Sequence, residues 1–192
     1  MRESTTHKAN SKIKNYFKWA LWVILVQFIL FNISAALYAY KFNRVYDAPS
    51  SNTVSKQSNI LTKTWRFFSG PMQRKMAVEA KPVFKYENIV FHTKNKLAIN
   101  AWYARPDSIA KGTVILFHGW LSNKSILLPE ASEFLYDGYA VLLIDLRAHG
   151  NSEGKVTTIG IKESEEVKLV WDYIVAKGEK HIFLYGISMG AV

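Results

Sequence analysis

The chain has 192 residues, no cysteine and a formal net charge of +10, a length that suits one domain plus an extension. All of the excess positive charge lies in residues 1–82, which hold 13 Lys and Arg against 3 Asp and Glu, whereas residues 83–192 hold 12 of each kind. A nucleic-acid-binding domain carries its own basic face, so this distribution argues against that function for residues 83–192. The absence of cysteine excludes disulfide bonds and is compatible with either side of a membrane.

An apolar segment from Trp19 to Tyr40 has no charged side chain over 22 residues. As a helix it would be about 33 Å long, enough to cross the hydrocarbon core of a bilayer. Aromatic residues gather at both of its ends, as they do at membrane interfaces. A cleaved signal peptide is the alternative, because Ser34-Ala35-Ala36 resembles a cleavage site. The apolar run continues beyond that site, so we favour an uncleaved anchor.

The flanking charges favour a cytoplasmic N-terminus, since five Lys and Arg lie in the 18 residues before the span and three in the 18 after it. The sequence thus predicts a cytoplasmic basic tail (1–18), a transmembrane helix (19–40), a juxtamembrane linker (41–82) and an extracytoplasmic folded domain (83–192). Within the linker, residues 43–59 are polar, whereas residues 60–81 include Trp65, Phe67 and Phe68. The latter stretch either covers the sheet as an irregular segment, which we favour, or lies at the membrane interface.

From Val83 on, strand and helix patterns alternate in the way that builds a parallel α/β sheet. Two segments of mixed alternation, 83–91 and 97–103, predict an antiparallel hairpin at its start. Continuous apolar runs predict three buried strands, at 114–117, 139–144 and 181–185. Apolar stripes at helical spacing predict two helices between them, over 127–135 and 167–175, ended by Gly138 and Gly178.

Each of the three buried strands ends in a polar motif. The first is followed by His118-Gly119-Trp120, and the second by D-x-R-x-H-G-x-S over residues 145–152. The third is followed by Gly186-Ile187-Ser188-Met189-Gly190, a G-x-S-x-G sequence that places a serine on a sharp strand-to-helix turn. Gly186 and Gly190 are expected because a Cβ in so tight a turn would collide with its neighbours.

These three motifs, in this order, resemble the α/β-hydrolase superfamily, and more narrowly its membrane-associated esterase, lipase and serine-aminopeptidase-like branch. The resemblance covers the N-terminal half of such a domain, a mostly parallel sheet with an antiparallel start, here preceded by one transmembrane helix. One departure is Ala148, which stands where the family usually has glycine. We expect the backbone there to have φ below zero, because alanine would then be tolerated.

The resemblance implies that Ser188 is the catalytic nucleophile. The backbone N–H groups of Met189 and Trp120 would form the oxyanion hole. Their side chains would either shape an acyl pocket or fill the core. Asp145 is not expected to be the triad acid but to form an ion pair or loop hydrogen bond near Arg147.

The sequence does not identify the base that would activate Ser188. In this fold the acid and the histidine follow the serine, and only four residues do so here. His149 is expected to brace its loop. His118 is the nearest candidate base, but the family uses that position to shape the oxyanion loop, so we do not favour it.

The sequence therefore predicts a membrane-anchored serine hydrolase that cleaves an ester, thioester or amide of a small-molecule, lipid or peptide acyl substrate. No metal, other cofactor or nucleic-acid partner is expected. The chain is expected to be incomplete and inactive alone. The alternative is a non-catalytic truncated product, or a fragment that needs a second chain. A basic membrane-surface binding protein is a weaker reading, because residues 83–192 carry no net charge.

Overall fold

The computed structural model describes residues 3–47 and 59–192, and it divides into two compact units. The first comprises residues 1–40 and 57–71, and the second comprises residues 41–56 and 72–192.

The first unit is built from two helices, α1 (Glu3–Phe42) and α2 (Ile60–Ser69). Within residues 15–42 of α1, the most apolar window of 18 residues has a mean hydropathy of 2.2 and none of it is buried in the protein, so this helix is long and apolar enough to cross a membrane. An N-terminal signal sequence has the same properties.

The helix α2 corrects the prediction of an irregular segment after residue 59. The side chain of Asn59 caps it by accepting a hydrogen bond from the N–H of Thr62 (2.9 Å). It ends at Gly70, whose φ of +79° favours glycine. The breaker at residues 69–71 was visible in the sequence, whereas the cap that lets a ten-residue helix begin was not recognised.

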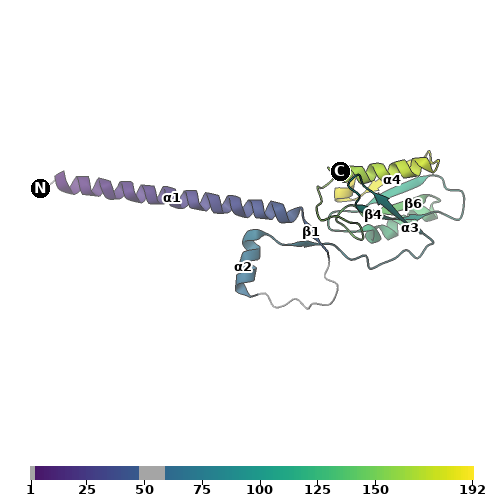
Figure 1. Ribbon diagram of the computed structural model, residues 1–192, viewed down its shortest axis with the longest axis horizontal. Coiled ribbons are helices and arrows are strands. Elements are labelled where there is room, and N and C mark those ends of the chain that lie inside the picture. The colour runs from purple at the N-terminus through teal and green to yellow at the C-terminus, as the bar shows by residue number, and fades with distance from the viewer. Residues whose placement is uncertain (1–2, 48–58) are drawn as a thin grey trace. The chain divides into compact units, whose positions relative to one another are not determined.

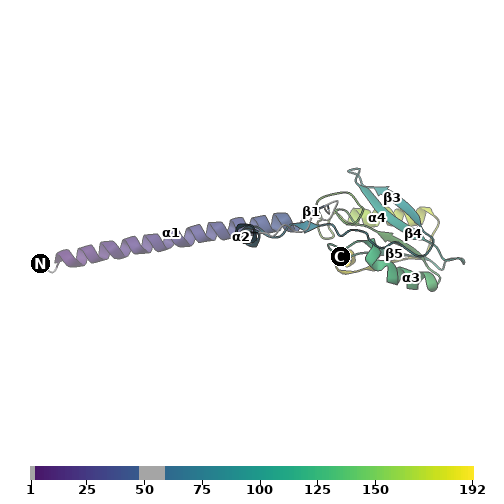
Figure 2. The same ribbon diagram turned by 90° about the horizontal axis from the view of Figure 1, so that it is seen from below.

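The second unit contains a five-stranded sheet in the order β3-β4-β6-β5-β7 (Figures 1 and 2). The strands are β3 (Glu87–His92), β4 (Ala98–Ala104), β5 (Thr113–Phe117), β6 (Ala140–Ile144) and β7 (Ile182–Gly186). β3 pairs antiparallel with β4, and β4 with β6, whereas β5 pairs parallel with both β6 and β7. A mostly parallel α/β sheet with an antiparallel start is therefore confirmed. β3 begins at Glu87 rather than Val83; Pro82, just before, has no N–H to donate.

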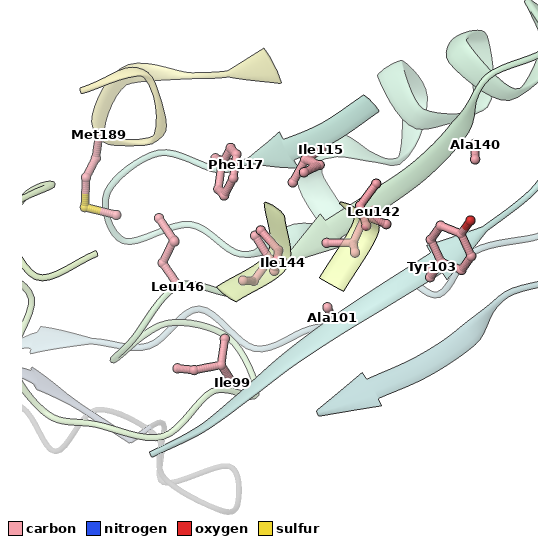
Figure 3. Packing of buried hydrophobic residues seen from close by; sticks show 12 residues of the cluster. Ile99, Ala101, Tyr103, Ile115, Phe117, Ala140, Leu142, Ile144, Leu146 and Met189 are labelled. Carbon is pink, nitrogen blue, oxygen red and sulfur yellow. The ribbon is translucent and has the colours of Figure 1, made fainter. Parts of the chain in front are cut away.

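Side chains of β5 and β6 alternate between two cores on opposite faces of the sheet. Helix α4 (Ser164–Ala176) covers one face through Val170 and Ile174, and the cluster there is drawn in Figure 3. The short 3₁₀ helix η1 (Lys124–Leu127) and helix α3 (Leu128–Tyr136) cover the other through Leu127 and Ala131. Since both faces are covered, the central strands are apolar at every position, and this explains their continuous runs.

Part of the expected linker is ordered against the sheet's loops. β1 (Val45–Tyr46) pairs in parallel with β2 (Gln73–Arg74), and Val45 donates its N–H to the carbonyl oxygen of Lys155 (2.9 Å). Val45 is buried, and Lys75 donates to the carbonyl oxygen of Ser152 (2.9 Å). Residues 41–47 and 72–77 therefore belong to the second unit, while the middle of the predicted polar linker, residues 48–58, lies outside the described residues.

Candidate active site

Ser188 lies on the tight turn between β7 and the short 3₁₀ helix η2 (Ser188–Ala191). The residue is exposed, and its φ of +54° is in the left-handed region that residues with side chains rarely adopt. Its flanking residues allow the turn to close. A Cβ on Gly186 would be 2.1 Å from the carbonyl oxygen of Gly190, and a Cβ on Gly190 would be 2.5 Å from that of Phe117. The turn therefore requires glycine at both positions, and it presents Ser188 outward.

The loop after β5 borders Ser188. A Cβ on Gly119 would be 3.5 Å from the Cβ of Ser188, and the N–H of Ile187 donates to the carbonyl oxygen of Phe117 (3.1 Å). Trp120 is the next residue of this loop, and Met189 lies in the first turn of η2, where backbone N–H groups have no acceptor within the helix. The two predicted oxyanion donors therefore come from segments that meet at Ser188. Their role in an oxyanion hole stays a prediction.

The side chains of Met189 and Trp120 have different surroundings. Met189 is only 3% exposed and joins the core on the α4 side of the sheet, as Figure 3 shows. Trp120 is half-buried, and its ring stacks on that of Phe42 with centroids 4.4 Å apart. Its Nε1–H is buried and has no acceptor among the described residues. These side chains were expected either to shape an acyl pocket or to fill the core, and Met189 fills the core.

The motif after β6 is organised around a buried ion pair between Asp145 and Lys124. The Asp145 carboxylate also accepts hydrogen bonds from the backbone N–H groups of Lys124 (2.7 Å) and Asn151 (2.9 Å). A Cβ on Gly150 would be 2.3 Å from the Asp145 carboxyl carbon, so this position must be glycine. An ion pair or a loop hydrogen bond was predicted for Asp145, and the structure has both, the first with Lys124 and the second from Asn151.

Arg147 instead reaches the start of α4. It donates to Glu166 (2.6 Å) and to Glu165 (2.9 Å), and thereby ties the loop after β6 to that helix. Burial raises the pKa of Glu166 to about 7, although the hydrogen bond from Arg147 acts in the opposite direction. The salt bridge is short and charge-assisted, so it holds the loop in place in spite of this desolvation.

Ala148 contradicts the expectation of a negative φ. Its φ is +62°, its side chain is completely buried, and its N–H donates to the carbonyl oxygen of Glu153 (2.9 Å). The left-handed conformation costs a non-glycine residue about 1 kcal/mol. This cost is offset because the Arg147 contacts before Ala148 and the hydrogen bond from Asn151 to Asp145 after it fix the path of the loop.

Comparison with known proteins agrees with this geometry. Residues 108–192 match the family model described as serine aminopeptidase, S33. An esterase of Pyrococcus furiosus is 32% identical in sequence over 61% of this chain and 49% of its own, with a TM-score of 0.55. Residues 108–192 therefore belong to the α/β-hydrolase superfamily.

Two further comparisons show how much of each protein is matched. The uncharacterized protein YqkD of Bacillus subtilis is 37% identical over 82 residues, which are 42% of this chain and 27% of that protein. An alpha-beta serine hydrolase homologue from Coxiella burnetii is 24% identical and superposes over 58% of this chain and 56% of its own with a TM-score of 0.50, which supports the fold alone. The chain thus spans about half or less of the length of these relatives.

Neither His118 nor His149 is placed to activate Ser188. The Nε2 of His118 accepts from the N–H of Leu146 (3.1 Å), and its Nδ1 lies 2.7 Å from the carbonyl oxygen of Gly119. His149 is held in the same way, by the N–H of Leu121 (3.1 Å) and the carbonyl oxygen of Arg147 (2.8 Å).

Both rings therefore use both nitrogens to brace loops. Burial lowers the pKa of His118 to about 4, helped by the neighbouring His149, and burial also lowers the pKa of His149. His149 thus braces its loop, as predicted, and His118 does not act as a free base in this arrangement. Among residues 3–47 and 59–192, no three His, Asp or Glu side chains gather in a way that would hold a metal ion.

Two site-forming residues were missed in the sequence. Lys124 is 1% exposed and lies over the Trp102 ring (4.6 Å), although lysine is almost always a surface residue. It falls in the sequence Asn123-Lys124-Ser125, which reads as a glycosylation signal. Asn123 is itself buried and donates to the carbonyl oxygen of Ala77 (3.1 Å), so its side chain is not open to modification in the folded protein.

Glu163 is the second missed residue, and it organises the loop beneath the serine turn. Its carboxylate accepts four hydrogen bonds, from the hydroxyl groups of Thr157 and Thr158 and from the N–H groups of Thr158 and Gly160. Burial alone would raise the pKa of Glu163, but these hydrogen bonds lower it. Thr157 in turn lies 3.5 Å from the Met189 sulfur. The carboxylate has no sequence motif of its own, because its partners are mostly local backbone and hydroxyl groups.

Proposed function

We propose that this protein is a membrane-anchored serine hydrolase in which Ser188 forms an acyl-enzyme with an ester, thioester or amide substrate. The observation that carries the proposal is the turn itself. An exposed serine with φ of +54°, between two glycines that no other residue could replace, is held beside the loop of Gly119 and Trp120. Backbone strain of this kind persists at functional sites, where it serves to orient a reacting group.

The chemistry proposed has two steps. The Ser188 oxygen attacks the carbonyl carbon of the substrate, the alcohol, thiol or amine leaves with a proton, and water then hydrolyses the acyl-serine to the free acid. The N–H groups of Met189 and Trp120 would stabilise the negative oxygen of each tetrahedral intermediate. Among these substrates we favour esters, because the matched protein of Pyrococcus furiosus, 32% identical over the matched region, is an esterase.

A base and an acid are needed for this reaction, and the described residues around Ser188 offer neither in a free state. The proposal therefore concerns the complete hydrolase domain. The alternative is a non-catalytic product that has this fold but no catalytic triad. Reading the gene beyond the codon for Val192 separates the two, since the hydrolase requires an in-frame Asp or Glu and a His from the remaining strands.

The anchor in this proposal is α1. Its apolar segment of 28 residues carries aromatic residues at both ends, and its flanking charges favour a cytoplasmic N-terminus with the hydrolase domain on the other side. Carbonate extraction of membranes followed by N-terminal sequencing tests it. Recovery of a soluble chain that begins near Leu37 would identify a cleaved signal peptide instead.

The nucleophile is tested by labelling the complete domain with a fluorophosphonate probe. Labelling is expected in the native protein and absent in Ser188→Ala. The matched control is Ser132→Ala on the exposed surface of α3, which removes a hydroxyl group far along the chain from the turn and should leave labelling unchanged. Equal labelling of the native protein and Ser188→Ala would refute the assignment.

A further inference from the structure

We propose that α2 lies in the interface of the same bilayer that α1 spans, with its apolar face among the acyl chains and its two cations toward anionic lipid headgroups. This inference rests on the membrane anchor of the proposed function. It assigns a second, separate point of lipid contact, which follows from the faces of α2, its bonds to α1 and its direction.

The faces of α2 have the distribution of an interfacial helix. At 100° per residue, its large apolar side chains fall within one arc of about 160°, and Lys63 and Arg66 lie outside that arc. The apolar side chains are each 55–78% exposed in the structure: Ile60, Leu61, Trp65, Phe67 and Phe68. Five large apolar side chains that are exposed on one face of a ten-residue helix indicate a partner surface rather than water. Aromatic and aliphatic residues on one face and cations on the other fit a lipid surface.

The end of α2 is bonded to α1 within the first unit. Two of the last carbonyl groups of α2, which have no partner inside the helix, accept hydrogen bonds from α1 side chains. Ser34 donates to the carbonyl oxygen of Phe68 (2.5 Å), and Tyr38 donates to that of Phe67. Carbonyl groups in a surface helix are normally satisfied by water, whereas in a bilayer they need partners from the protein. Two of these carbonyl groups are thus satisfied without water.

The position and direction of α2 also fit the interface. Residues 15–42 are about 42 Å long as a helix, close to the thickness of a bilayer with its headgroups. Ser34 and Tyr38 are then about 12 and 6 Å from the end of that segment, which is the depth at which interfacial helices lie. Figures 1 and 2 show α2 running across the axis of α1 rather than along it, so α2 lies in the membrane plane when α1 crosses the membrane.

The consequence is a double attachment. α1 ends shortly before β1 and α2 ends shortly before β2, and these two strands pair side by side in parallel. The chain therefore leaves the bilayer twice and enters the second unit through a two-stranded connection rather than through one free linker.

The experiment uses single-cysteine variants of the full chain, which has no native cysteine. An environment-sensitive fluorophore is attached at Leu61→Cys and Trp65→Cys on the apolar face and at Lys63→Cys and Arg66→Cys on the polar face. The protein is reconstituted in vesicles of phosphatidylcholine and phosphatidylglycerol in equal parts. Phe28→Cys on α1 reports the span, and Ser132→Cys on α3 reports water. Quenching by nitroxide lipid and by aqueous iodide is compared.

We expect lipid quenching to exceed iodide quenching several-fold at positions 61 and 65, and the reverse at positions 63 and 66. In phosphatidylcholine alone, lipid quenching at position 61 should fall. Iodide quenching at all four positions to the level of position 132 would overturn the inference, and so would protection from both quenchers, which would mean that protein covers the helix. If position 28 is also open to iodide, the anchor of the proposed function fails; if it is embedded while positions 61 and 65 are not, only the inference about α2 fails.

Discussion

At the scale of single residues, the second unit contains ionic contacts of two different kinds. Lys124 and Asp145 are almost completely buried, and the carboxylate accepts backbone hydrogen bonds as well. Lys168 and Asp172 form an exposed pair on α4, 2.6 Å apart. Removing one member of a buried pair leaves an uncompensated charge, whereas an exposed pair contributes little.

We therefore expect Lys124→Met to lower the free energy of unfolding by about 3–5 kcal/mol, because it leaves Asp145 buried without its cation. Lys168→Met, the matched control, should lower it by about 0.5 kcal/mol or less. Urea unfolding followed by circular dichroism measures both. Similar losses for the two variants would show that the buried Lys124–Asp145 pair contributes no more to the free energy of unfolding than the exposed pair.

His118 predicts a dependence of stability on pH. Its pKa falls from 6.5 in the unfolded chain to about 4 in the folded protein, so the unfolded state binds a proton first as the pH drops. The neutral ring thus contributes stability that is fully present above pH 6.5 and is lost toward pH 4, about 3 kcal/mol in all. Glu166 acts oppositely, because its pKa is raised to about 7 and its contribution weakens as the pH rises from 4.5.

The contribution of His118 is isolated by comparing variants across this range. The difference in unfolding free energy between the native protein and His118→Gln should shrink as the pH falls from 7 to 4. His92→Gln, at an exposed position of β3, is the matched control for the change of histidine to glutamine. A constant difference for His118→Gln across the range would mean that His118 is protonated in the folded state as readily as in the unfolded one.

At the scale of elements, the strands and helices that meet at Ser188 could be predicted because each buries an apolar pattern. The runs at β5 and β6 are continuous since both faces of the sheet are covered, and the serine turn is specified by its glycines. Lys124 and the left-handed Ala148 could not be predicted, because contacts with residues distant in the sequence determine them. Glu163 could not be predicted because its partners are local backbone and hydroxyl groups that form no motif. β1 was missed for the same reason, since two residues form a strand only when β2 and the loop at Lys155 are beside them.

The serine turn and its neighbouring loop should respond differently to the same added methyl group. Gly190→Ala would place a Cβ 2.5 Å from the carbonyl oxygen of Phe117, against rigid backbone, and should lower the free energy of unfolding by about 3 kcal/mol or more.

Gly119→Ala would place a Cβ 3.5 Å from the Cβ of Ser188, which is an ordinary contact. It should change the unfolding free energy by less than about 1 kcal/mol while slowing fluorophosphonate labelling in the complete domain. Thermal melts and labelling rates of the two variants separate these effects, and a stable Gly190→Ala would contradict the geometry of the turn.

At the scale of the whole molecule, β7 is the edge of the sheet in the described part of the chain, paired with β5 alone. Phe183 and Leu184 on this strand are 49% and 55% exposed. An apolar edge strand offers unpaired N–H and C=O groups to any other chain. The 192-residue chain by itself is therefore expected to associate through β7 when no further strand covers that edge.

Leu184→Lys tests this, because a charged side chain on an edge strand opposes pairing with a second chain. The variant should shift the 192-residue chain in detergent from large species toward the monomer, as measured by light scattering after size-exclusion chromatography. The matched control is Val175→Lys on α4, which is 49% exposed and adds the same charge away from the edge. An equal shift in both variants would assign the association to net charge or to the apolar helices instead. In a domain whose sheet continues past β7, Leu184→Lys should instead lower stability, because the same lysine would then be buried on a covered face of the sheet.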